Sequence, residues 1–218
     1  MGNPFGFVTY ILEHPDSFLE LFRQHVELTA LSVVFAVAAA LPLAVLASRI
    51  NALAGPMTWL AGVGQTIPSL AVLALVLPFL GIGFAPSLFA LTIRALLPIF
   101  LNAYVGIRGV DRAAIEAARG MGMNGAERLF LVELPLAVPV ILAGVQTATV
   151  QNVGVATLAA FIGGGGLGDL ILQGLAMVDT PVLLAGAVPV ALLAMLADVG
   201  MRRIGRLLTP GGLRVVRA

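Results

Sequence analysis

The residue types that most often carry chemistry are scarce in this chain. It contains no Cys, and its twelve Lys and Arg residues are all Arg. Thiolate nucleophiles and zinc–thiolate sites are therefore excluded, as are Schiff-base lysines and the lysine of a Walker-type phosphate-binding loop. The two histidines, His14 and His25, lie near the N-terminus and carboxylates are few, so the sequence does not suggest a metal enzyme.

A run of glycines is the second chemical signal. Residues 163–168 read Gly-Gly-Gly-Gly-Leu-Gly, which formally satisfies the dinucleotide-binding pattern Gly-x-Gly-x-x-Gly. That site needs a strand before the glycines, whereas here a long apolar window precedes them. We expect a tight re-entrant turn, because glycine lets backbone segments pass closely. This turn either lies beside an outer gate or has a purely structural role. The residues assigned to this outer loop and gate are Gly163, Gly164, Gly165, Gly166, Gly168 and Asp169.

Polar side chains inside apolar windows are the third signal. Gln146, Thr149 and Asn152 follow one another at intervals of three residues and share roughly one helix face. Polar groups at membrane depth face the helix bundle or a water-filled cavity. We expect these three to line a translocation path, with hydrogen bonding between helices as the alternative. The same interpretation extends to Gln65, Thr66, Ser69 and Asn102.

The composition identifies the elements that must position these residues. The chain has 218 residues, of which 60% are hydrophobic and 11% charged, whereas a soluble domain has about 45–50% and about 25%. A disordered chain, a nucleic-acid module and an ordinary soluble enzyme are excluded. Apolar windows long enough to cross a bilayer predict an all-α polytopic membrane protein of one domain. The five spans that we expect cover about 27–48, 56–80, 86–108, 135–161 and 181–201.

The arginines orient these spans. Arg49, the arginines of the segment 109–134 and those that follow the fifth span all fall on one side of a five-span arrangement. That side should be the cytoplasm, which places the N-terminus outside and the C-terminus inside. Residues 162–180 then form an outer loop, and residues 206–218 a cytoplasmic tail. Residues 1–26, with their charges and Pro15, are expected to be an extracytoplasmic segment with a short helix on the membrane surface.

Two further charges fall in or near the spans. Arg94 lies inside the third window, where we expect it to be functional, to snorkel outward, or to pair with an outer carboxylate such as Asp169 or Asp179. Asp198 precedes Arg202 by four residues, which predicts an ion pair on the surface of one helix.

The cytoplasmic loop 109–134 is expected to fold as two short helices. Asp111 can cap the first helix, and Gly120 and Gly122 can end it. Asn124, with Glu127 three residues later, resembles a capping box for the second helix. Such a helix pair offers a compact surface to a partner, although loop physics alone allows a simple solvated linker equally well.

The spacing in this loop resembles a known signature. Transmembrane subunits of bacterial ATP-binding-cassette (ABC) importers carry Glu-Ala-Ala, three residues, Gly, nine residues, a β-branched aliphatic residue, one residue and Leu-Pro. The chain matches every spacing, with Val132 at the aliphatic position where Ile is usual. The positions that the resemblance assigns to ATPase coupling are Glu116, Ala117, Ala118, Gly122, Leu134 and Pro135.

The resemblance extends to a subfamily. Residues 132–175, the sequence Gln-Thr-Ile-Pro-Ser-Leu at 65–70 and Gly-Val-Asp at 109–111 are similar to permeases for glycine betaine, choline and related osmoprotectants. Methionine importer permeases share the glycine-rich stretch. The aromatic residues Trp59, Tyr10 and Tyr104 are too scattered to form the aromatic cage that commonly holds a quaternary ammonium, so high-affinity recognition is expected in another protein.

The resemblance implies a division of labour. Such permeases form the type I importer fold in the bacterial inner membrane and pair as homo- or heterodimers. The cytoplasmic loop sits in a groove on each ATPase subunit, an extracytoplasmic binding protein delivers the cargo, and ATP with Mg²⁺ binds to the ATPase. This chain is then no enzyme, holds no cofactor and contacts no nucleic acid.

Three alternatives remain open. The same machine could carry methionine or another amino acid. A stand-alone secondary transporter or channel would be expected to show internal repeats and ionisable groups at the midplane of the membrane. A polytopic membrane enzyme would have few side chains available as nucleophile or general base, because the chain has no Cys, no Lys and no histidine in an expected span.

Overall fold

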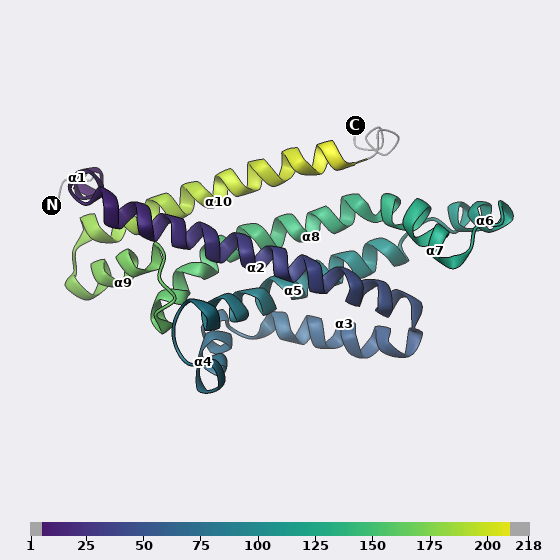
Figure 1. The fold of residues 1–218 in the computed structure, drawn as a ribbon, viewed down its shortest axis with the longest axis horizontal. Helices are drawn as coiled ribbons and strands as arrows, with labels where there is room; N and C mark the ends of the chain where they lie inside the picture. The colour runs from purple at the N-terminus through teal and green to yellow at the C-terminus, as the bar shows by residue number, and fades with distance from the viewer. Residues whose placement is uncertain (1–5, 210–218) are drawn as a thin grey trace.

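The computed structural model describes residues 6–209 and is helical throughout that part of the chain, with no strand. Four long helices run along its longest axis (Figure 1): α2 (Pro15–Arg49), α5 (Phe84–Arg108), α8 (Leu134–Val155) and α10 (Thr180–Leu208). At one end lie α6 (Arg112–Gly120) and α7 (Gly125–Arg128), and we name this the loop end. At the opposite end, named the glycine end, lie α1 (Gly6–Glu13) and α9 (Gly168–Met177).

Helices α2, α5 and α8 form the centre of the bundle. Small side chains at their contacts let the backbones approach closely, as in membrane helix pairs. Gly144 of α8 illustrates this, since a Cβ there would lie 2.5 Å from Cβ of Asn102 on α5. The fully buried alanines of α2 in this core are Ala36, Ala40, Ala44 and Ala47.

The N-terminal region differs from the expectation. Instead of a surface helix that ends near residue 26, α2 starts at Pro15 and continues without a break to Arg49. Proline suits the first turn of a helix, where its missing N–H costs no hydrogen bond, and Asp16 lies in the same turn. The charges that argued against a span here stay at the surface, for example in the exposed ion pair of Arg23 with Glu27.

The second apolar window is bent instead of forming one straight helix. It consists of α3 (Asn51–Thr66) and α4 (Ser69–Leu80), which meet at an angle of 103°. Pro68 explains the break, because a proline lacks the N–H donor and disfavours helical geometry in the residue before it. Among residues 6–209, four helices are long and apolar enough to cross a membrane, and the bent pair makes five if it counts as one span.

Arg94 of α5 lies at this break. Its Nη1 atom is 3.5 Å from the carbonyl oxygens of Gln65 and Ile67, where α3 ends. Of the three alternatives for Arg94, the pairing with Asp169 or Asp179 is not found, since the guanidinium lies beside the carbonyl end of α3. A functional role for Arg94 stays a prediction. This contact depends on the break between α3 and α4, which the hydropathy pattern does not predict.

The irregular turns at both ends of α8 complete the fold. A π-helical turn, η1 (Leu129–Glu133), precedes α8, and a 3₁₀ segment, η2 (Ala156–Ile162), follows it. The expected outer loop 162–180 is largely ordered, since it contains α9 between the glycine turn and α10. Of the expected tail, only the part up to Thr209 is described, and Arg214 and Arg217 lie outside it.

Candidate functional site

The loop 109–134 folds as the two predicted short helices. The N–H of Ala113 donates to Oδ1 of Asp111 at 2.9 Å, so the predicted cap of α6 is confirmed. Helix α6 ends at Gly120, and Gly122, two residues later, has a φ of +80°, the left-handed conformation that glycine adopts without strain. The helix therefore ends where the two glycines predicted, but the left-handed conformation belongs to Gly122 and not to Gly120.

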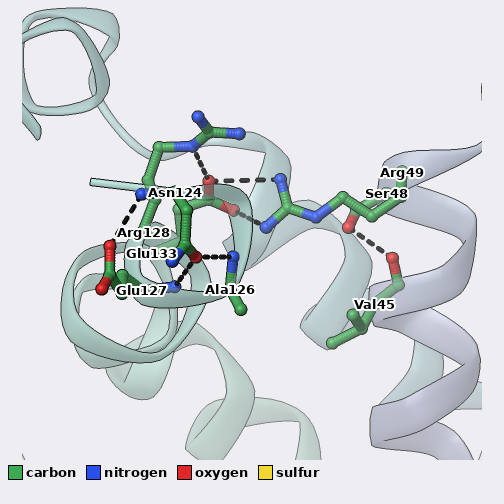
Figure 2. Close-up of polar contacts among 8 residues, drawn as sticks. All are labelled: Val45, Ser48, Arg49, Asn124, Ala126, Glu127, Arg128 and Glu133. Atoms are coloured by element: carbon green, nitrogen blue, oxygen red, sulfur yellow. Dashed lines mark hydrogen bonds and ion pairs between the residues drawn. The ribbon is translucent and has the colours of Figure 1, made fainter. Parts of the chain in front are cut away.

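The second helix carries the predicted capping box. Oδ1 of Asn124 accepts hydrogen bonds from the N–H groups of Ala126 at 2.9 Å and Glu127 at 3.0 Å. In return, the N–H of Asn124 donates to Oε2 of Glu127 at 2.8 Å (Figure 2). These contacts fix the start of α7 within a few residues of Gly122, so the two helices of the loop have a defined relative orientation.

The signature residues divide between surface and interior. Glu116, Ala117 and Gly122 are exposed, whereas Ala118 is buried. Leu134 and Pro135 are half-buried in the first turn of α8. The loop therefore presents an exposed face at the extreme end of the molecule and a buried face toward its own helices (Figure 1).

A buried carboxylate anchors this loop, and the sequence analysis missed it. Glu133 is 3% exposed and accepts hydrogen bonds from two arginines that come from different segments. Oε2 lies 2.5 Å from Nη2 of Arg49, and Oε1 lies 2.9 Å from Nε of Arg128 and 3.2 Å from Nη1 of Arg49 (Figure 2). We name Arg49, Arg128 and Glu133 the arginine clasp.

The clasp connects three parts of the chain. Arg49 is the last residue of α2, Arg128 the last of α7, and Glu133 ends the π-helical turn before α8. A bidentate guanidinium–carboxylate pair fixes orientation as well as distance. The clasp therefore ties the loop to α2 as well as to α8. The one available signal was a carboxylate directly beside the Leu-Pro of the signature.

The polar residues expected to line a path do not share one environment. Asn152 is 2% exposed, and its Nδ2 donates to Oγ of Ser32 at 2.9 Å and to the carbonyl of Leu91 at 3.1 Å. Nε2 of Gln146 donates to Oδ1 of Asp198 on α10 at 2.7 Å. Both residues make the hydrogen bonds between helices that the alternative expects, and a role for them in lining a path stays a prediction.

The remaining path candidates bond within their own helices or lie at the break. Thr149 and Asn102 donate to the carbonyls of Val145 at 2.8 Å and Pro98 at 2.9 Å. Gln65 and Thr66 are exposed at the end of α3, and Ser69 is half-buried at the start of α4. A path lined by Thr149, Asn102, Gln65, Thr66 and Ser69 stays a prediction. The predicted ion pair of Asp198 with Arg202 is confirmed.

The glycine run forms the close-packed turn that was expected. Gly163, Gly165 and Gly166 have φ values of +70°, +76° and +87°. Gly168 has no space for a side chain, because a Cβ there would collide with the carbonyl of Thr157. Burial raises the pKa of the Asp169 carboxyl, which follows in the first turn of α9. A gating role for this turn stays a prediction.

Metal chemistry has no support in the described part of the chain. Within residues 6–209, no group of three or more His, Asp or Glu side chains could hold a metal ion. The described residues form an exposed loop at one end of the molecule, which the arginine clasp connects to α2 and which continues directly into α8.

Comparison with known proteins defines the class. Residues 32–210 match the family of binding-protein-dependent transport system inner membrane components, and the chain belongs to this family of ABC importer permeases. The MetNI methionine ABC transporter in an inward-facing conformation has the same fold, with a TM-score of 0.82 at 22% identity over 96% of this chain and all of that one. The all-α permease fold expected from the sequence is thereby confirmed.

Two permeases named for osmoprotectant cargoes are more similar to this chain in sequence than MetNI is. The choline transport system permease protein OpuBB of Bacillus subtilis is 44% identical over 88% of both chains. The glycine betaine/carnitine/choline transport system permease protein OpuCB of the same organism is 41% identical over 95% of both. The resemblance to osmoprotectant permeases seen in the sequence is therefore confirmed.

Proposed function

We propose that this chain is the permease subunit of an ATP-driven importer for small quaternary amines such as glycine betaine, choline and carnitine. The observation that carries the proposal is the identity of 41–44% over 88–95% of the length to permeases named for these cargoes. Methionine is the second candidate, because the MetNI methionine transporter has the same fold. Its identity of 22% makes it the weaker candidate.

In this proposal, a separate subunit hydrolyses ATP. ATP and Mg²⁺ bind to that ATPase, since this chain has no Lys to serve a Walker-type loop. The ATPase docks on the exposed face of the 109–134 loop, which includes Glu116, Ala117 and Gly122. The small Ala117 side chain and the bare Gly122 backbone favour close approach of a partner surface.

The arginine clasp gives this docking a mechanical consequence. When the ATPases close, each displaces its bound loop. Because Glu133 bonds to Arg49 at the end of α2, the displacement passes to α2 as well as to α8, which continues directly from the loop. Two of the three central helices then move together, and this motion converts an inward-open pathway to an outward-open one.

The proposed assembly places the loop end in the cytoplasm. Arg49, the loop arginines and the arginines at the end of α10 support this orientation, since positive charge concentrates on the cytoplasmic side of membrane proteins. The N-terminus then lies outside and the C-terminus inside. A second permease chain, identical or paralogous, completes the pathway, and an extracytoplasmic binding protein delivers cargo at the glycine end.

Reconstitution tests the proposal. The permease, its ATPase and its binding protein are incorporated into proteoliposomes, and uptake of labelled glycine betaine, choline and methionine is measured with internal ATP. We expect saturable, ATP-dependent uptake of glycine betaine and choline and none of methionine. Uptake of methionine alone would overturn the cargo, and failure of the permease to bind an ATPase would overturn the function as a whole.

A further inference from the structure

The glycine end holds a pocket that the proposed function does not yet use. It has a volume of about 340 Å³ and opens to the surface. Helix α2 contributes Arg23, Gln24 and Glu27, the start of α5 contributes Phe84, and the glycine turn contributes residues 163–165. This end is the outer one in the proposed orientation, so the pocket lies where cargo would leave a binding protein.

Opposite charges and an aromatic ring meet in this pocket. Nε of Arg23 lies 3.6 Å from Oε1 of Glu27, and the two side chains are 70% and 46% exposed. An exposed pair of this kind contributes only about 0–1 kcal/mol. A ligand that brings both charges can therefore replace the pair at little cost. Phe84 adds an aromatic ring, and aromatic rings attract quaternary ammonium groups.

The wall of the pocket is built to a fixed shape. The N–H of Gly166 donates to Oε1 of Gln24 at 3.2 Å, which holds the glycine turn against α2. A Cβ on Gly165 would collide with the same Oε1 atom, and one on Gly164 would collide with Oγ of Ser87. The turn thus has no side chains facing these neighbours, and its backbone is fixed before any ligand arrives. Such pre-organisation lowers the entropic cost of binding.

We propose that this pocket is a weak outer site for small zwitterions that carry a quaternary ammonium and a carboxylate. The carboxylate of the ligand binds the Arg23 guanidinium, and its ammonium group lies against Glu27 and Phe84. The proposal rests on the proposed function and deepens it, because it assigns the two charges of the cargo to separate residues of this chain. A site on a transport path must bind weakly enough to release its ligand, which an open pocket with exposed charges satisfies.

The assignment separates two cargoes. Glycine betaine and carnitine have a carboxylate, whereas choline has a hydroxyl group in its place. Arg23 therefore contributes to binding of glycine betaine and carnitine but not of choline, while Glu27 contributes to all three. A site for docking of the binding protein, or a structural ion pair, would not distinguish the cargoes in this way.

Ligand-detected NMR tests the site directly. The permease–ATPase complex in nanodiscs, without binding protein, is titrated with millimolar glycine betaine or choline, and saturation transfer to the trimethylammonium protons is measured. The variants are Arg23→Gln and Glu27→Gln. The matched controls are Asp16→Asn, an exposed carboxylate at the start of α2, and Arg203→Gln, an exposed arginine on α10. Basal ATPase activity and gel-filtration profiles show that each variant is folded.

We expect Arg23→Gln to weaken binding of glycine betaine about two- to fivefold, as the loss of one exposed charge contact predicts, and to leave choline unchanged. Glu27→Gln should weaken binding of both ligands, and the controls neither. Equal effects of Arg23→Gln on both ligands, or equal binding by all variants, would overturn the site. Reduced uptake with unchanged NMR binding would assign these residues to binding-protein docking instead and would also overturn it. If the wild-type proteoliposomes take up quaternary amines, any of these contrary results refutes this site alone and not the proposed function.

Discussion

The arginine clasp makes the most demanding prediction. Glu133→Gln keeps the size of the side chain but removes the charge that faces Arg49 and Arg128. The amide oxygen can still accept from one guanidinium, while the NH₂ group faces the other donor. We expect the variant to fold, to keep ATPase activity and to transport less cargo for each ATP hydrolysed, because the loop is no longer held to α2.

The magnitude follows from burial. Removing one partner of a fully buried ion pair costs about 3–5 kcal/mol, and an exposed pair contributes about 0–1 kcal/mol. The Glu133 side chain is 3% exposed, but those of Arg49 and Arg128 are 35% and 17% exposed and can regain water. We therefore expect Glu133→Gln to weaken the contact between the loop and α2 by about 1–3 kcal/mol, a value between those for an exposed and a fully buried pair.

The assay measures cargo uptake and ATP hydrolysis in the same proteoliposomes, together with the apparent melting temperature. Arg202→Gln is the matched control, since it removes an exposed ion pair with Asp198 at a distance from the loop. The reasoning is refuted if Glu133→Gln leaves the ratio of uptake to hydrolysis unchanged, or if Arg202→Gln lowers that ratio equally.

Three other predictions concern single side chains. Gly122→Ala places a Cβ at a φ of +80°, which strains the loop by about 1–2 kcal/mol. The variant should therefore lower cargo uptake per ATP hydrolysed. The control Gly125→Ala should leave this ratio unchanged, because Gly125 has no positive φ and a Cβ there would have no neighbour within 4 Å. Asn152→Ala removes the buried hydrogen bonds to Oγ of Ser32 and to the carbonyl of Leu91 and should cost about 1–3 kcal/mol. The cost is measured as a lower melting temperature than that of Thr147→Ala, whose hydroxyl donates to Ala143 within α8. Because burial raises the pKa of Asp169, its carboxylate destabilises the fold above that pKa and the cost disappears as the pH falls through it. Asp169→Asn should therefore raise the melting temperature at pH 7.5 and give progressively less advantage in acid, and an advantage independent of pH would contradict the assignment.

Local signals in the sequence predicted the loop well. A cap such as Asp111 or the pair Asn124–Glu127 acts over two or three residues, so the letters alone contain the interaction. The same holds for the ion pair of Asp198 with Arg202, which lie one helical turn apart. Predictions of this kind need no knowledge of the tertiary fold.

Long-range contacts were beyond the sequence. Glu133 and Arg49 are separated by 84 residues, and Gln146 and Asp198 by 52, so their pairing depends on how the helices pack. Helix boundaries failed for a related reason. Pro15 argued against a long helix in residues 1–26, although in a first turn a proline starts a helix. Pro68 bends the second window, which the hydropathy pattern predicted as one span. The effect of a proline depends on its position in the turn, which a single sequence does not reveal.

The π-helical turn before α8 has a consequence for how the loop is aimed. A π turn holds one residue more than an α turn, and each residue of an α-helix advances the chain by about 100°. Deleting one residue between Leu129 and Glu133 would allow a regular helix and would rotate everything before it by about that angle relative to α8. Glu116 and Ala117 would then face a different direction although no contact of their own had changed. The direction in which the exposed face of the loop points is therefore set by helical phase, and one inserted residue in the backbone fixes that phase.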